Sequence, residues 1–596
     1  MCRVLFRAFA GLALLVMSMA PVRADEAGSE GDSAQVVLKA EPADPGPDFR
    51  SRFAAALDTQ IQRTKGGADE RDAAWLAQLR SFYGSREGAP VWVTSKGWNG
   101  RAKAAIAEMA NAADWGLDPA AFEIPQLPAN APVEELASAE LGLSRATVKY
   151  AFHARGGRID PSSLSLWLDR TEDPVYATAV MIGIISNADG AAALRAMHPP
   201  YPEFELLREA YVAMREEIQH PKQPDPAGIL AMGPSIKLGT WHPDVLVVRH
   251  KLQVPAEDGF QSKFDEKLAD ALHDYLSERK VRARWGRIDD KARAVLNRPP
   301  PPPKKEDLQR LLANMERWRW LPRDLGAFHI WNNLPEMETR IVEQGEVIHQ
   351  ERIIIGQPDT QTPVFSERMS QIVFQPEWGV PPSIKVNDLL PKLQAGDYDV
   401  LKRRNMRILG LSGKELRPTR FKWNKVDIRD IGIYQRSGSS NPLGRVKFLF
   451  PNKHHVYMHD TNNRALFKSS WRLYSHGCVR VRDPERLAVM LLARDKGWDK
   501  ETVEKLLANS KTPNNKIKLD RPFPVHTVYF TMVPGDDRTI VKYDDMYGHD
   551  RRVIQALSGV PAVKIAAADP ARSQLREIDE AAPPVRRRAS RDGDDD

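Results

Sequence analysis

The sequence predicts a multidomain α+β protein, with a helical N-terminal region, a small helical module and a mainly β C-terminal domain. Residues 49–225 place apolar side chains three and four positions apart, the spacing of amphipathic helices. Five consecutive prolines at 299–303 mark a stiff boundary. Beyond residue 326, short runs rich in β-branched and aromatic residues alternate with Gly, Pro and Asn, the pattern of strands joined by turns.

The N-terminus has the pattern of an export signal over residues 1–24. Two arginines precede an apolar run at 8–20, and Val-Arg-Ala at 22–24 offers small residues around a cleavage point. The run is short for a bilayer span, so a cleaved signal is favoured over an uncleaved signal-anchor. We therefore expect an exported protein with no stable membrane span after signal cleavage. Residues 25–48, rich in Ala, Glu, Asp, Gly and Pro, are predicted to be a flexible linker.

Helical patterns fill the next part of the chain. Residues 49–225 are predicted to form a helical N-terminal domain, and residues 226–297 a compact module of three amphipathic helices, with Asp289 or Asp290 near the start of the third. Residues 298–325 combine the proline run with one further helix that Pro322 ends.

The β-rich domain is predicted over residues 326–557. A less regular insertion at about 384–430 interrupts it, and this stretch could be a lid or a plain surface excursion. Residues 558–596, dominated by Ala, Pro, Arg and Asp, are predicted to be a disordered tail. The net charge of +7 suits an acidic polymer or an anionic surface, but no concentrated basic patch indicates nucleic acid.

Cysteine usage singles out one residue. The chain has two cysteines, Cys2 and Cys478, and removal of the signal would leave Cys478 alone. Exported proteins usually use cysteines in disulfide pairs. A lone cysteine there is either a free, reactive thiol or a small buried apolar side chain, and composition does not decide between them.

The neighbours of Cys478 favour a reactive thiol. If Tyr474–Asp483 is extended, His476, Cys478 and Arg480 share one side, and Gly477 lets a backbone or ligand approach closely. An imidazole and a guanidinium beside a thiol favour the thiolate, which is the nucleophilic form.

His459 supplies a second imidazole, at the end of an earlier strand. It could act as the proton shuttle if two antiparallel strands, joined by residues 461–474, bring it within reach of Cys478. A zinc site from Cys478, His459 and His476 is an alternative, but the sequence has no Cys-x-x-Cys and no clear fourth ligand.

The string HDTNNRALFKSSWRLYSHGCVRV resembles the signature of the L,D-transpeptidase family, the YkuD-type catalytic domain. Further stretches (NMERWRWLP, TPVFS, PEWGVPPSI, NPLGRVKFLFPN and YDDMYGHD) look like the larger, YcbB-like branch of that family. GRIDP and the 226–297 module resemble the scaffold and the peptidoglycan-binding-like module of that branch. The likeness extends from about residue 70 to 558.

The resemblance implies a chemistry for each motif residue. Cys478 would attack the carbonyl between the third and fourth residues of a peptidoglycan stem peptide, releasing D-alanine and leaving a thioester. His459 would be the general base and acid, or His476 if the two histidines have reversed roles. Backbone N–H groups near Gly477 would form the oxyanion hole, with Ser475 and Arg480 in support. A diaminopimelate amine of a second stem would then take the acyl group, giving a 3→3 cross-link, and no metal or organic cofactor is implied.

Several readings stay open beside this one. The acyl acceptor could instead be an amine of an envelope protein, or water, which would make the protein a carboxypeptidase; an inert wall-binding protein is a third reading. The 226–297 module lacks the string usual in glycan binders, so it could be a spacer. Trp423, Trp471 and Tyr474 are candidate stacking surfaces for the substrate, although core packing is the commoner role for any one of them. The expected partners are peptidoglycan stem peptides, with no nucleic acid, and the expected location is the periplasm.

Overall fold

The structure is a computed structural model that describes residues 46–64, 70–169, 174–220, 228–298, 303–509, 511–535 and 537–559. The predicted signal peptide, most of the predicted linker and nearly all of the predicted tail lie outside these residues. Among the helices described, none is both long enough and apolar enough to span a membrane.

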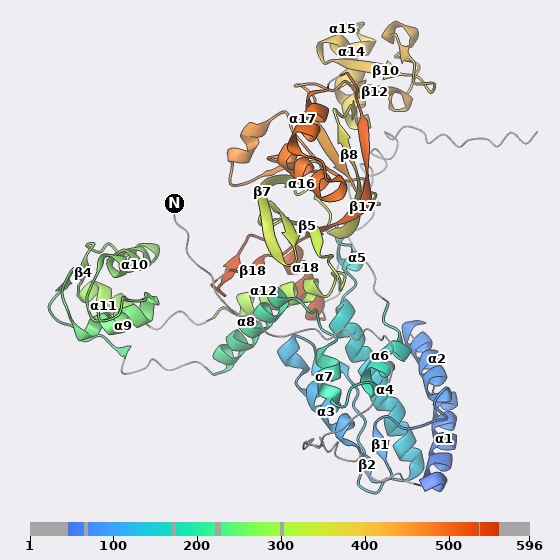
Figure 1. Ribbon diagram of the computed structural model, residues 1–596, viewed down its shortest axis with the longest axis vertical. Helices are drawn as coiled ribbons and strands as arrows, with labels where there is room; N and C mark the ends of the chain where they lie inside the picture. The colour runs from blue at the N-terminus through green and yellow to red at the C-terminus, as the bar shows by residue number, and fades with distance from the viewer. Residues whose placement is uncertain are drawn as a thin grey trace, which may run out of the picture.

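The N-terminal region is helical, as predicted (Figure 1). Its main helices are α1 (Gly46–Arg63), α2 (Glu70–Gly84), α3 (Gly100–Ala110), α4 (Val133–Gly156), α6 (Ala177–Ile185), α7 (Gly190–Arg195) and α8 (Pro202–Gln219). A buried carboxylate on α4 holds the bundle to the segment before α3, because Glu140 accepts the backbone N–H groups of Val91 (2.6 Å) and Trp92 (2.9 Å) and the hydroxyl of Tyr83 (2.7 Å). A buried charge is tolerable when it is hydrogen-bonded in this way.

A small module stands apart from the rest of the molecule in Figure 1. It consists of β3 (Ile236–Lys237), α9 (Pro243–Leu252), α10 (Glu266–Glu278), β4 (Arg287–Ile288) and α11 (Asp290–Leu296). Its own apolar core includes Val245, Phe264 and Leu272. Helix α11 begins at Asp290, in line with the prediction of Asp289 or Asp290 near its start, and Asp289 caps it by accepting the N–H of Ala292 at 2.9 Å. The short β3–β4 pairing was not predicted.

The C-terminal domain is built on a mixed nine-stranded sheet in the order β15-β7-β16-β14-β13-β8-β17-β5-β6. Because β6 also pairs with β7, the sheet closes on itself. The strands are β5 (Phe328–Asn333), β6 (Glu338–Glu343), β7 (Glu346–Gly356), β8 (Phe365–Phe374), β13 (Val446–Leu449), β14 (Met458–His459), β15 (Leu473–Ser475), β16 (Val479–Val481) and β17 (Asn515–Val528). Helices α16 (Pro484–Lys496), α17 (Lys500–Ala508) and α18 (His549–Leu557) complete the domain. The mainly β expectation for this domain is confirmed.

The insertion is a folded subdomain rather than an irregular excursion. It contains α14 (Leu390–Gln394), α15 (Asp399–Arg403) and a four-stranded sheet of β9 (Trp378–Gly379), β10 (Met406–Leu409), β11 (Glu415–Leu416) and β12 (Gly432–Gln435). A separate core that includes Leu389, Ile408 and Trp423 holds it together. Figure 1 places it at the end of the molecule opposite the N-terminal helices. Its strands are only two to four residues long, too short to give a clear alternating pattern in the sequence.

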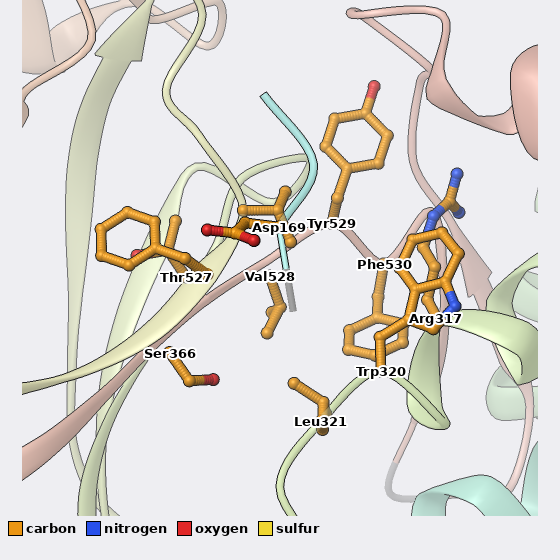
Figure 2. Close-up of a pocket in the computed structure, with 11 residues that line it drawn as sticks. Asp169, Arg317, Trp320, Leu321, Ser366, Thr527, Val528, Tyr529 and Phe530 are labelled. Atoms are coloured by element: carbon orange, nitrogen blue, oxygen red, sulfur yellow. The ribbon is translucent and has the colours of Figure 1, made fainter. Parts of the chain in front are cut away.

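Helix α12 (Lys305–Trp318) joins the helical region to the β domain. It ends four residues before Pro322, the residue predicted to stop it. Arg317 on α12 pairs with Asp550 on α18 at 2.6 Å, and Glu316 accepts the N–H of Ile159 at 3.1 Å. A crevice beside this joint, lined by residues that include Asp169, Arg317 and Tyr529, is shown in Figure 2.

Candidate active site

Three adjacent strands bring the predicted residues together. β14 pairs with β16 so that His459 lies opposite Arg480, and β13 pairs with β14 so that Lys447 lies opposite His459. Paired residues share a face of the sheet, as do residues two apart on one strand. Cys478, two residues before Arg480, therefore belongs to the same face as His459.

The pairing of β14 with β16 is parallel, whereas the sequence suggested antiparallel strands. The connection explains the difference. After His459 the chain passes a short helix at Arg464–Lys468, forms β15 along β7, turns, and returns as β16 between β7 and β14. A connection that contains a strand of its own lets the returning strand run in the same direction as β14.

The turn between β15 and β16 is fixed by a buried hydrogen-bond network. Gly477 has φ +110°, a conformation that glycine adopts without strain. Ser475 Oγ donates to the Cys478 carbonyl at 2.6 Å and accepts the Gly477 N–H at 3.2 Å. Thr362 Oγ1 donates to the Gly477 carbonyl at 2.8 Å, and Thr360 Oγ1 donates to the Ser475 carbonyl at 3.1 Å. These hydrogen bonds fix the conformation of the turn that carries the thiol.

The strand alternation that predicted His476 beside Cys478 is absent from the structure. The predicted continuous strand is broken, because β15 ends at Ser475 and β16 begins at Val479. The alternation therefore does not carry across Gly477, and His476 is exposed in the turn. His459, which is 4% exposed, is the imidazole that the sheet register brings beside the Cys478 strand.

Burial moves both titrating groups toward their neutral forms. Cys478 is a free thiol of intermediate exposure. Burial raises the pKa of its thiol to about 11, although a backbone hydrogen bond from Tyr457 and the positive charge of Arg480 act in the opposite direction. Burial, with the nearby Arg480 guanidinium, lowers the pKa of His459 to about 3. At neutral pH the site therefore holds a thiol and an uncharged imidazole.

His459 has a ring nitrogen available for proton transfer. Within the described part of the chain, its Nδ1 is buried and has no hydrogen-bond partner. A buried nitrogen without a partner is costly, and in an acid–base site it marks the position that takes a proton. This geometry supports proton transfer from the sulfur to the imidazole during attack rather than a pre-formed ion pair.

Tyr457 and Lys447 complete the face and were missed from the sequence. The Tyr457 side chain hydrogen-bonds Cys478, its ring centroid is 5.6 Å from that of His459, and Lys447 Nζ lies 5.6 Å from the Tyr457 ring. The signal was available in part: if Val456 and Met458 point to one face of this strand, Tyr457 and His459 point to the other.

The predicted stacking aromatics fall into two groups. Trp423 is 4% exposed, and its Nε1 donates to the Pro418 carbonyl inside the insertion, so it is a core residue of that subdomain rather than a substrate surface. Trp471 and Tyr474 are 48% and 38% exposed on the segment leading to Cys478, and they remain candidates for substrate contact.

The zinc alternative has no geometric support. In the residues that the structure describes, no group of three or more His, Cys, Asp or Glu side chains is placed to hold a metal ion. The crevice of Figure 2 is also separate from this site, since its lining contains none of the predicted site residues.

Comparison with known proteins assigns two regions of the chain. Residues 77–210 match the Scaffold domain family, and residues 327–504, which contain Cys478 and His459, match the L,D-transpeptidase catalytic domain family YkuD. A Haemophilus influenzae protein named "Putative L,D-transpeptidase" is 32% identical over 247 residues, which cover 41% of this chain and 49% of that protein. The chain thus spans about half the length of this curated relative.

Two solved structures are similar at low identity. One is the L,D-transpeptidase (residues 123–326) of Xylanimonas cellulosilytica, with 12% identity and a TM-score of 0.13, covering 50% of this chain and 100% of that one. The other is a fused Zn-dependent amidase/peptidase/peptidoglycan-binding domain-containing protein of Clostridium acetobutylicum, with 12% identity and a TM-score of 0.13, covering 50% of this chain and 99% of that one.

Proposed function

We infer that this chain, which carries an L,D-transpeptidase catalytic domain over residues 327–504 and a scaffold domain over residues 77–210, is a peptidoglycan L,D-transpeptidase with Cys478 as its nucleophile. The observation that carries the proposal is a single free thiol on the same sheet face as a buried, neutral histidine with an unpartnered ring nitrogen. That pair is sufficient for acyl transfer without a metal or an organic cofactor.

The reaction begins with attack of the Cys478 sulfur on the stem-peptide carbonyl while the thiol proton passes to His459. Because the thiol pKa is raised and the imidazole pKa is lowered, the proton moves as the new C–S bond forms. The protonated His459 then gives the proton to the departing amine, D-alanine leaves, and a thioester remains. Amides near the rigid turn at Gly477 stabilise the oxyanion.

The second half-reaction transfers the acyl group to an amine. Neutral His459 removes a proton from a diaminopimelate amine of another stem as that nitrogen attacks the thioester. The C–S bond breaks, the sulfur recovers a proton, and a 3→3 cross-link forms. This function belongs in the periplasm, with the helical region as a scaffold and the insertion at 384–430 as a lid.

Product analysis tests the proposal directly. We expect the protein, incubated with a disaccharide-tetrapeptide, to form a dimer lighter than two substrates by one D-alanine, measured by mass spectrometry. Cys478→Ala should form none while keeping its thermal unfolding temperature, because the change removes only a partly exposed sulfur. A dimer in the Cys478→Ala sample would contradict the assignment of the nucleophile.

The same experiment separates the alternatives. A tripeptide without a dimer would indicate hydrolysis, the carboxypeptidase reading. Transfer to an added envelope-protein peptide with a free amine, in preference to a second stem, would indicate protein attachment. Absence of any acyl-enzyme would leave the wall-binding reading.

A further inference from the structure

A row of positively charged side chains crosses the sheet on the face that carries His459. The register pairs Arg480 with His459, His459 with Lys447, Lys447 with Val373, and Val373 with Lys516. These residues belong to β16, β14, β13, β8 and β17 in turn, and directly paired residues share one face. Lys518 is two residues beyond Lys516 on β17, so it continues the same face in the next row.

The cations of this row lack acidic partners. Among the described residues, Lys447, Lys516, Lys518 and Arg480 form no salt bridge. Nearby cations behave differently, since Arg445 pairs with Glu485 and Lys496 pairs with Asp520. No acidic side chain of the described residues therefore neutralises the charge of this row.

Lys447 shows that the arrangement costs free energy in the unliganded protein. Its side chain is partly buried, and burial together with the charge of Lys516 lowers its pKa. Lys447 and Lys516 repel each other on the sheet face that carries His459. A negatively charged group of the ligand would offset this repulsion.

The thiolate cannot be that anion for the whole row. Strands are about 4.8 Å apart, so Lys447 lies about 10 Å from Arg480 and Lys516 a further 10 Å or so from Lys447. Arg480 and Lys447 are near the sulfur, but Lys516 and Lys518 are exposed on β17 and beyond its reach. The ligand that matches the row is an extended chain that carries several negative charges along its length, within reach of long lysine side chains.

We propose that Lys447, Lys516 and Lys518 form a track that binds the free carboxylates of the donor stem peptide, and so fixes the direction in which the donor lies across the sheet. This inference rests on the proposed function. An extended tetrapeptide stem carries free carboxylates on its γ-linked D-glutamate, on diaminopimelate and at its C-terminus. Lys447 would hold the carboxylate nearest the scissile bond, and Lys516 and Lys518 those farther along.

Binding measured without catalysis tests the track. In the Cys478→Ala background, the dissociation constant of the tetrapeptide stem is measured by calorimetry and compared with that of the same peptide with all three of its free carboxylates converted to carboxamides. We expect Lys447→Met to raise it about tenfold for the acidic peptide, since the site is partly buried. Lys516→Gln and Lys518→Gln, at exposed positions, should each raise it about threefold.

The carboxamide peptide distinguishes a charge contact from a general loss of fit. It should bind more weakly than the acidic peptide, and the lysine variants should not weaken it further. Lys500→Gln, an exposed lysine on α17, is the matched control and should change neither constant. Unchanged affinity in the track variants, equal losses for both peptides, or no binding of the acidic peptide would overturn the track. Lys516→Gln also covers the possibility that Lys447→Met does not fold.

The two proposals fail separately. Cross-linked product from the unaltered enzyme, with no lysine effect on binding, would leave the function and remove the track. Lysine-dependent binding of the acidic peptide with no turnover by the unaltered enzyme would leave the track and remove the proposed reaction.

Discussion

At the residue scale, the site combines a nucleophile and a base that are both uncharged at neutral pH. Burial raises the pKa of the Cys478 thiol to about 11 and lowers that of the His459 imidazole to about 3. A low-pKa thiolate, which the sequence pattern of Cys478 beside His476 and Arg480 suggested, is therefore not the resting state. A neutral thiol also resists oxidation and alkylation.

The rate of alkylation reports whether Cys478 is a thiol or a thiolate. We expect the rate of Cys478 modification by iodoacetamide to be slow at pH 7 and to rise through pH 9 and above, because only the thiolate reacts. Arg480→Met should move the midpoint higher still, since the guanidinium lowers the thiol pKa. The measurement is mass spectrometry of the alkylated fraction against time at each pH. A rate that is already maximal at pH 6 would show a thiolate–imidazolium pair instead.

Tyr457 supplies the next prediction at this scale. Its side chain hydrogen-bonds Cys478, and removing the hydroxyl should raise the thiol pKa and reduce kcat about tenfold with little change in KM. The variant is Tyr457→Phe, measured by steady-state kinetics of D-alanine release. Tyr434→Phe, in the insertion, is the control for loss of a tyrosine hydroxyl. A change in KM alone would mean that Tyr457 contacts substrate rather than supporting the sulfur.

At the element scale, the strands of the site were predictable but their connection was not. Alternation in the segment before His459 placed that residue on a strand, and the structure has β14 there. The parallel pairing and the break at Gly477 depend on β15 lying along β7, a contact between residues more than 100 positions apart. Local pattern carries no information on such pairings, which is also why Lys447 was missed as a member of the site.

The network under the turn gives a test of how far rigidity matters. Thr362 Oγ1 donates to the Gly477 carbonyl at 2.8 Å and accepts the Gly356 N–H at 2.9 Å, all in buried surroundings. Thr362→Val leaves both groups unpaired and should lower the free energy of unfolding by about 2 kcal/mol. It should also lower kcat, because the thiol-bearing turn loses its fixed position.

Thr339→Val is the matched control in the same sheet. Thr339 is equally buried, but its hydroxyl has no hydrogen-bond partner among the described residues, so the change should be neutral or stabilising. Both free energies come from denaturant unfolding at constant pH. Equal losses in the two variants would show that the substitution itself, rather than the turn network, is responsible.

At the scale of the whole molecule, histidines whose pKa is lowered by burial make stability depend on pH. Burial lowers the pKa of His153 and His526 to about 4 and of His459 to about 3, and lowers those of His198 and His549 well below the usual value. His153 and His198 lie in the helical region and the other three in the β domain. The stability of both parts of the molecule, which α12 joins, therefore depends on pH in the same direction.

The sign follows from which state binds protons. Above about pH 6.5 the histidines are neutral in both the folded and the unfolded chain. They then bind no protons in either state, so they do not lower the free energy of unfolding. Below that pH the unfolded chain takes up protons that the folded protein does not, and stability falls until the folded pKa values are reached. The slope approaches about 1.4 kcal/mol per pH unit for each histidine as an upper bound. Between pH 6.5 and 5 few carboxylates titrate, so this window isolates the histidines.

We expect the thermal unfolding temperature to be flat from pH 8 to 7 and to drop steeply from pH 6.5 to 5 at constant ionic strength. His526→Asn should make that drop shallower, because it removes one buried imidazole whose nitrogens face Ser366 and the Leu325 carbonyl. His220→Asn, whose side chain is 73% exposed, should leave the slope unchanged. An unfolding temperature independent of pH across this window would mean that these histidines titrate alike in the folded and unfolded states, and the lowered pKa of His459 would then have to be abandoned with the others.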